Sequence, residues 1–445
     1  MTSSGKLRCK RLYKGDAVTG TAGQKGASVA ESFAWYVGID WGNEAHVLCL
    51  MDATGTLRGT RLVAHTAVAV HDAIQWVLQE TGATPDGIAV GLERPRGVLV
   101  DTWLERGFPL FAVNPKQLDR FRDRFTAGGA KDDRRDAHAV ADALRTDRRA
   151  FRRIQPDAAP VIQLREWCRI VEELHEEEQR LANRLREQLY RIDAAWLMLC
   201  PAANEPWLWT VLADTPHPAA WPTWSRRRLA SLLRAHHIRR LTVDEVIAAV
   251  RQPRLHAAAG VAEAVEARIA SLVPPLRLVH AQRTVADRRI EQGLASLVAE
   301  APDAEPREHR DAEILQSLPG VGRMVAATML TEATGPLADR DYVTLRAHAG
   351  TAPITKRSGK RAAFVHMRYA CKPRLRHALY HWARTSIQHD QTARAYYDTL
   401  RARGHHHARA LRSVADRWLR ILIAMLRAGT LYDASRFAQA IPRPV

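Results

Sequence analysis

Two aspartates spaced for a shared helix face are the strongest chemical signal in the sequence. Asp133 and Asp136 lie in the stretch Lys131–Ala137, just ahead of apolar residues that repeat with helical spacing. Residues three apart lie on one face of a helix, so the pattern predicts two neighbouring carboxylates. Their mutual repulsion favours a divalent cation between them. Acidic residues in the first turn of a helix also suit its dipole, so the pair alone leaves both interpretations open.

Two further acidic residues follow predicted strands upstream. Asp40 ends an apolar run that begins at Trp35, and Glu93 ends a second run that begins at Gly87. A single acid after a strand is often only a turn residue. Four carboxylates gathered at one site would instead supply the hard oxygen ligands that suit Mg²⁺, with Mn²⁺ as a substitute.

The elements around these acids predict a mixed α/β domain. Three short apolar runs separated by tight turns predict an antiparallel meander, and helices then alternate with two more strands. We expect strands at 35–40, 45–52, 57–63, 87–93 and 109–113, and helices at 71–79, 98–105, from 114 and from 137. This order resembles the RNase H-like fold, in which acids from the first strand, the fourth strand and a late helix converge and hold divalent metals.

The middle of the chain predicts long paired helices. Apolar residues between 161 and 192 follow heptad-like spacing with dense charge between them, which indicates a helix seeking a partner. A second candidate at 261–298 contains Pro274 and Pro275, which we expect to end one helix and start another. Tryptophans between 201 and 240 either stack on nucleobases or pack a small irregular module.

Two glycine-containing loops carry the chemistry expected of the C-terminal part. Gly320 and Gly322 precede a predicted helix at 324–331, a helix-hairpin-helix pattern whose backbone amides could contact a DNA phosphate. Ser358 lies in a second loop, where it either caps a turn or attacks a phosphate. Basic residues surround and follow this serine and are candidates for nucleic-acid binding: Lys356, Arg357, Lys360, Arg361, Lys372, Arg374, Arg376, Arg401, Arg403 and Arg409.

The distribution of charge points to a polyanionic partner. The formal net charge is +18, and the stretch from Arg346 to the end holds 20 Lys/Arg against 4 Asp/Glu, a net +16. Nucleic acid is the expected partner of such a field, ahead of an anionic membrane. No apolar run reaches transmembrane length. The five scattered cysteines contain no CxxC pair and indicate reduced thiols in a cytoplasm.

Motifs at both ends of the chain resemble those of one family, the insertion-sequence transposases with a RuvC-like DEDD domain and a C-terminal serine-bearing domain. Piv-type invertases and bridge-RNA-guided recombinases belong to this family. The matching stretches span much of the chain: Val37–Asp40, Leu92–Pro95, Val113–Pro115, Lys131–Ala137, Leu318–Gly322, Ala349–Pro353, Ser358–Lys360, Leu375–Leu379 and Asp433–Arg436.

The resemblance implies roles for individual residues. Asp40, Glu93, Asp133 and Asp136 would be the metal-binding DEDD acids, and Ser358 the nucleophile that forms a covalent phosphoserine with DNA. It also implies donor and target DNA as substrates, a structured guide RNA, and a homo-oligomer (dimer or tetramer) that joins one subunit's acids to another's serine. Lys372-Pro373 departs from the family's usual Gly-Asn pair, and the middle region is longer than in compact members.

The predicted architecture has four parts. They are a disordered leader (1–32), a RuvC-like domain (33–150), a helical coiled-coil region with a Trp/Pro-rich insert (151–310), and a mostly helical serine-bearing domain (311–445). Two other functions remain open on the sequence. One is a RuvC-like junction endonuclease in which Ser358 is structural, and the other is a catalytically silent nucleic-acid-binding protein.

Overall fold

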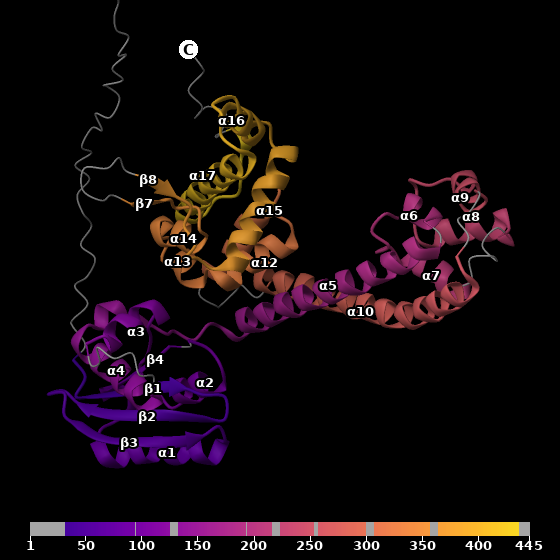
Figure 1. Cartoon of the computed structure of the whole chain (residues 1–445). Coiled ribbons are helices and arrows are strands. Elements are labelled where there is room, and N and C mark those ends of the chain that lie inside the picture. The colour runs from indigo at the N-terminus through magenta and orange to yellow at the C-terminus, as the bar shows by residue number, and fades with distance from the viewer. Residues whose placement is uncertain are drawn as a thin grey trace, which may run out of the picture. The chain divides into compact units, whose positions relative to one another are not determined.

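The computed structural model describes residues 32–93, 95–124, 132–192, 194–215, 223–252, 257–299, 307–356 and 364–435. The predicted leader lies almost wholly outside them. The chain divides into two compact units, Met1–Pro156 and Asp157–Val445, and each is described by itself (Figure 1).

The first unit is a six-stranded sheet covered by helices. Its strands are β1 (Trp35–Trp41), β2 (Ala45–Asp52), β3 (Leu57–Ala64), β4 (Ile88–Leu92), β5 (Leu110–Ala112) and β6 (Arg152–Arg153), in the order β3-β2-β1-β4-β5-β6. β1, β4 and β5 run parallel, whereas β2, β3 and β6 pair antiparallel with their neighbours. The five predicted strands are confirmed, and the two-residue β6 was not foreseen.

Helices cover both faces of this sheet. They are α1 (Ala67–Thr81), α2 (Val98–Glu105), α3 (Pro115–Arg122) and α4 (Asp133–Thr146), with short 3-10 turns at Pro85–Gly87 and Arg148–Ala150. Leu48 and Leu50 of β2 share a core with α1 and α2, while Val47 and Cys49, which alternate with them, pack against α4. Burial on both faces explains why β2 is an almost continuous apolar run.

Two long helices dominate the second unit. α5 (Ala159–Ile192) packs along α10 (Ala259–Ala299), which confirms the predicted helix and supplies its partner (Figure 1). The expected break at Pro274 and Pro275 is wrong, because α10 continues through both prolines. Val273 and Leu276, which flank them, are buried in the same core as residues of α5, so packing on both sides offsets the hydrogen bonds that proline removes.

Four short helices pack at one end of this pair. They are α6 (Ala195–Leu199), α7 (Pro206–Asp214), α8 (Arg226–Ala235) and α9 (Val243–Val250). Trp207, Trp209 and Trp224 are buried in their core, which confirms packing over base stacking for these three. The indole N–H of Trp209 donates to the carbonyl of Ala203 over 2.8 Å, so burial leaves its donor satisfied.

The remaining elements surround the other end of α5 and α10. They are α11 (Arg307–Gln316), α12 (Arg323–Glu332), α13 (Thr334–Ala338), α14 (Tyr342–His348), the hairpin β7 (Ile354–Lys356) and β8 (Phe364–His366), α15 (Pro373–His389), α16 (Gln391–Ala402) and α17 (His407–Ala428). One apolar core joins α11, α12, α15 and α17 to Leu164 of α5 and Ile290 of α10.

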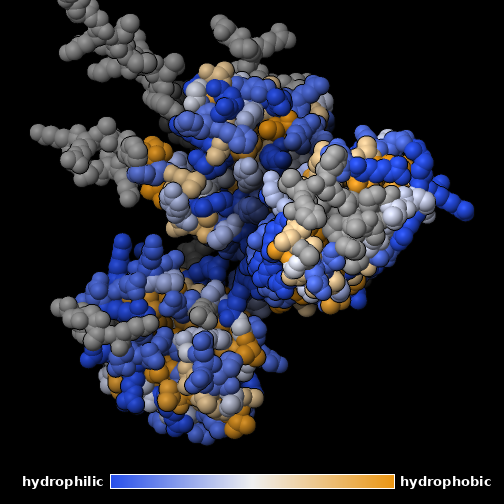
Figure 2. Space-filling model, turned by 45° about the vertical axis from the view of Figure 1, so that its right-hand side comes forward, coloured by the Kyte–Doolittle hydropathy of each residue, from blue (hydrophilic) through white to orange (hydrophobic). Residues whose placement is uncertain are grey.

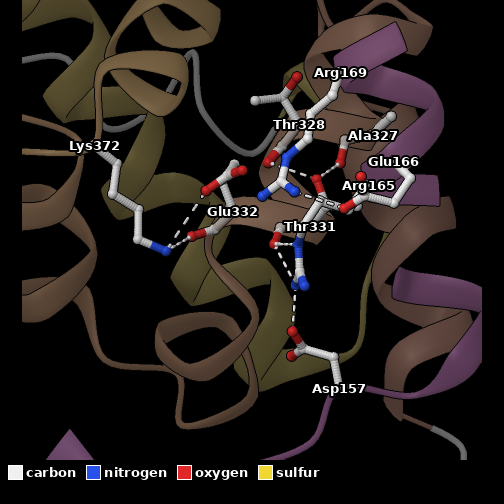
Figure 3. Close-up of polar contacts among 9 residues, drawn as sticks. All are labelled: Asp157, Arg165, Glu166, Arg169, Ala327, Thr328, Thr331, Glu332 and Lys372. Carbon is white, nitrogen blue, oxygen red and sulfur yellow. Dashed lines mark hydrogen bonds and ion pairs between the residues drawn. The ribbon is translucent and has the colours of Figure 1, made fainter. Parts of the chain in front are cut away.

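A buried arginine ties α5 to α12. Arg165 donates from Nε and a terminal nitrogen to the carbonyl of Thr331, at 3.1 and 2.9 Å, and pairs with Asp157 (Figure 3). Nearby, Lys372 donates to the carbonyl of Glu332 over 2.5 Å. A buried charge is stable only when it is paired and hydrogen-bonded, and these contacts use Nε and one terminal nitrogen of Arg165.

Hydrophilic residues cover much of the face shown in Figure 2. Among the described helices, none is both long and apolar enough to cross a membrane.

Candidate active site and nucleic-acid contacts

Parallel pairing of β1 and β4 brings Asp40 and Glu93 to the same edge of the sheet. Ile39 and Leu92 are partners in register, and each acid is the next residue along its strand direction. The apolar runs before them are buried, which fixes both strands and leaves the acids at their carboxyl ends. This edge is where side chains from neighbouring parallel strands meet.

α4 lies directly on β1 and positions the other two acids. An ideal Cβ on Gly38 would lie 2.0 Å from the carbonyl oxygen of Ala137 and 2.6 Å from the backbone nitrogen of Ala141, so only glycine permits this approach. The helix begins at Asp133, and Asp136 is buried one turn later. The carboxylate of Asp132 accepts a hydrogen bond from the Arg134 amide over 3.2 Å, so Asp132 is the N-cap.

The four acids share one electrostatic environment. Burial and, to a smaller extent, the carboxylates of Asp136, Asp133 and Glu93 together raise the pKa of Asp40 to about 6, against the opposing charge of Arg122. Coulomb interactions weaken with distance and with screening by salt. The three carboxylates that act on Asp40 therefore lie near it.

Arg122 of α3 is a member of this neighbourhood that sequence analysis missed. Its Nε lies 2.7 Å from Oδ1 of the buried Asp136, and a terminal nitrogen lies 2.7 Å from Asp119. A guanidinium therefore neutralises part of the acidic cluster. Only the (i, i+3) pairing with Asp119 was visible in the sequence, and that pairing gives no sign of the contact with α4.

The oxygen donors of the four acids suit a divalent cation, but their arrangement in this structure does not yet form its site. All four offer carboxylate oxygens, which hard cations prefer. As the described side chains lie, however, no three Asp, Glu, His or Cys residues form a group that could hold a metal ion. The contact between Arg122 and Asp136 occupies one of the oxygens that a metal would use.

The predicted nucleophile is not among the described residues. Ser358 follows β7 in the sequence, and it lies outside the described ranges together with Arg357, Lys360 and Arg361. The backbone of Lys356 ends β7 opposite Phe364 of β8, but its side chain is also outside the description.

The glycines of the helix-hairpin-helix pattern have a packing explanation. Gly320 has φ of +81°, and a Cβ there would lie 2.6 Å from the backbone nitrogen of Ser386 in α15. The indole of Trp382 donates to the carbonyl of Pro319 next to it, over 3.1 Å. Gly322 caps α12 with open space around its Cα. Close approach of α15 thus accounts for Gly320 without DNA.

Several candidate cations already have protein partners. Arg374 lies 2.5 Å from Glu172, and Arg376 donates to the carbonyl of Arg368 over 2.5 Å. Lys372 precedes Pro373, which occupies the first turn of α15, where proline is well tolerated. The other predicted cations of the described region are exposed: Arg401, Arg403 and Arg409.

Two protein-family models match the parts of the chain that hold these residues. A transposase family model matches residues 37–193, and a second, described as transposase IS116/IS110/IS902 family, matches residues 312–398. These ranges include all four acids and Ser358, respectively.

Individual relatives extend the match over most of the chain. A putative transposase, y4uE, of Sinorhizobium fredii is 42% identical over 49% of this chain and 61% of its own length. The mini-circle putative transposase for IS117 of Streptomyces coelicolor is 28% identical over 91% of this chain and 97% of its own. An uncharacterized 43.6 kDa protein of insertion element IS110, also from Streptomyces coelicolor, is 30% identical over 69% of this chain and 73% of its own. The chain belongs to the IS110 family of transposases.

Proposed function

We propose that this transposase cuts and rejoins DNA as the site-specific recombinase of an insertion element, using its four acids and Ser358 together. The observation that carries the proposal is the convergence on Asp40. Carboxylates from the end of β4 and the first turn of α4 all act on Asp40 of β1, whose pKa rises to about 6. The sheet order and the late helix over β1 agree with an RNase H-like fold.

In this proposal the acids hold Mg²⁺. Asp40, Glu93, Asp133 and Asp136 would be its ligands, and the bound metal would stabilise charge that develops on a phosphodiester during cleavage. Arg122 would have to release Asp136, or share it, when the metal binds. Until then its guanidinium limits repulsion among the acids and keeps α3 against α4.

Ser358 would supply the nucleophile. Its hydroxyl oxygen forms a bond to phosphorus while one P–O bond of the strand breaks, and the serine proton ends on the departing strand oxygen, so a hydroxyl is released. The reverse attack by a strand hydroxyl restores the serine and joins the DNA. Positive charge from Arg346 to the C-terminus, a net +16, would hold donor and target DNA and a structured guide RNA along their phosphates.

Trapping a protein–DNA adduct tests this function. Wild-type protein incubated with element-end DNA, Mg²⁺ and its copurifying RNA should yield a denaturation-resistant adduct, and Ser358→Ala should yield none. Cleavage by Ser358→Ala without an adduct would indicate a junction endonuclease that uses the acids alone. Tight DNA binding with no cleavage by the wild type would indicate a silent nucleic-acid-binding protein. Crosslinking of the wild type would show whether the active species is a dimer or a tetramer.

A further inference from the structure

A cavity of about 630 Å³ lies between α5, α15 and α17 in the second unit. Its walls are mostly apolar, with Leu379 and Tyr380 from α15 and Leu411 from α17. Gly350 and Thr351, in the turn that precedes β7, line it as well. This volume lies within the range of about 300–1,000 Å³ that is typical for small-molecule sites.

Two arginines give one part of this cavity its charge. Arg376 of α15 and Arg412 of α17 both line it, and the exposed Arg409 acts on Arg412 electrostatically. Burial, then repulsion from Arg376 and Arg409, lowers the pKa of Arg412 below its usual range, Tyr369 acts in the opposite direction, and none of these groups of the described residues is a carboxylate. Guanidiniums held together in this way destabilise one another until an anion lies between them.

Arg376 is held in place by the backbone. A terminal nitrogen donates to the carbonyls of Arg368 and Tyr369, at 2.5 and 3.3 Å. A Cβ on Gly350 would lie 2.9 Å from its Nε, so glycine at this turn makes room for the guanidinium. Its position is therefore fixed before any ligand arrives, which lowers the entropy cost of binding.

Acidic residues of the cavity already have cationic partners. Glu172 lies 2.5 Å from Nε of Arg374, and Glu176 lies 3.9 Å from Arg180. His175, between them, lies 3.2 Å from Arg283. The charge of Glu172 is thus neutralised and that of Glu176 only weakly countered, whereas Arg376 and Arg412 form no ion pair with a carboxylate of the described residues.

We propose that this cavity binds a single nucleotide of a nucleic-acid strand, with its phosphate on Arg376 and Arg412 and its base against Leu379, Tyr380 and Leu411. The inference rests on the proposed function only in taking nucleic acid as the ligand. A guanidinium pair suits a phosphate because its planar donors match the oxygens, and an aromatic ring beside it suits any base. The nucleotide would be an extruded or unpaired one, because the proposed contacts take its base out of the stack.

Titration of the full-length protein with deoxyadenosine 5′-monophosphate, adenosine 5′-monophosphate and inorganic phosphate tests the proposal. We expect both nucleotides to bind at least about fivefold more tightly than phosphate, since stacking adds to the charge contact. A preference between the two sugars would assign the strand as DNA or RNA. Equal affinity for phosphate and both nucleotides would overturn the nucleotide site.

Variants separate the two halves of the site. Arg412→Gln should weaken nucleotide binding about tenfold or more and should not lower the unfolding temperature of the ligand-free protein, because it relieves repulsion. Tyr380→Ala should weaken nucleotide binding and leave phosphate binding unchanged. Arg394→Gln removes the same charge from an exposed surface pair on α16 and serves as the control. Equal effects of Arg412→Gln and Arg394→Gln would refute the site.

The outcome of the nucleotide titration does not depend on the recombination assay. Mononucleotide binding needs neither Ser358 nor the four acids, so a failed titration with intact adduct formation would refute the cavity and leave the proposed function standing. Nucleotide binding with no adduct would do the reverse. As a second readout, millimolar nucleotide should raise the unfolding temperature of the wild type and not that of Arg412→Gln.

Discussion

Replacing Gly38 by alanine should separate α4 from β1 and disable the acidic site. A Cβ at this position would lie 2.0 Å from the Ala137 carbonyl oxygen, whereas contacts below 3.0 Å are essentially never observed. The helix must therefore shift by about 1 Å or more, because two backbones meet and neither has a flexible side chain to move. Asp133 and Asp136 move with it.

The size of the effect follows from that displacement. Overpacking a well-filled core costs about 1–3 kcal/mol, and a clash between backbones belongs at the upper end, near 3 kcal/mol. For a unit of this size we expect the unfolding temperature to fall by roughly 10 °C. A shift of about 1 Å in the acids should also reduce DNA cleavage by roughly a hundredfold.

Calorimetry and a cleavage assay on the full-length protein measure both effects. Gly87→Ala is the matched control, since it makes the same change in the same unit where no atom lies within 4 Å of the new Cβ. We expect the control to match the wild type in both assays. If Gly38→Ala proved as stable and as active as Gly87→Ala, α4 would not lie on β1 as described, and the geometry argued for the acids would be wrong.

Three further changes test separate parts of the account. Arg165→Met should destabilise the second unit by about 3 kcal/mol in a denaturant titration, because it leaves a buried carbonyl and Asp157 without their cation. Arg180→Met, at an exposed ion pair, should cost little in the same titration. Hydrogen bonds from Thr54 and its neighbours lower the pKa of Asp52 from 3.8 to about 2. The contribution of Asp52 to stability is therefore present above pH 4 and disappears as pH falls towards 2, and Asp52→Asn should remove that part of the pH dependence of unfolding. Exchange of three exposed arginines for glutamine should weaken binding to all DNA sequences alike: Arg401, Arg403 and Arg409. The slope of log binding constant against log salt concentration should fall by roughly 2–3, and a change in target choice at unaltered affinity would contradict this prediction.

The sequence predicted those parts of the fold that depend on local pattern. β1 and β4 are short apolar runs ended by an acid, and burial on both faces makes such runs visible. The spacing of apolar residues predicts α5 over its 34 residues, because one apolar face of the helix packs along α10. The signal is an uninterrupted apolar run in the strands and a helical periodicity in α5, and burial imposes both on neighbouring residues.

The parts that could not be predicted depend on contacts between distant residues. The ion pair between Arg122 and Asp136 joins two helices, and neither position is unusual within its own element. α10 passes through Pro274 because burial on both sides overrides a local preference. Gly320 matches a DNA-binding pattern, although the close backbone of α15 already requires glycine there.

Cleavage by Asp40→Asn tests the central claim most directly. Burial and neighbouring acids disfavour the charged form of Asp40, so the neutral asparagine should fold at least as well as the wild type. Asp142→Asn, on α4 beyond the site and paired with Arg145, is the control. We expect Asp40→Asn to lose cleavage of element-end DNA in Mg²⁺ by at least about a hundredfold, with Asp142→Asn close to the wild type. Cleavage by Asp40→Asn at the wild-type rate would contradict the account.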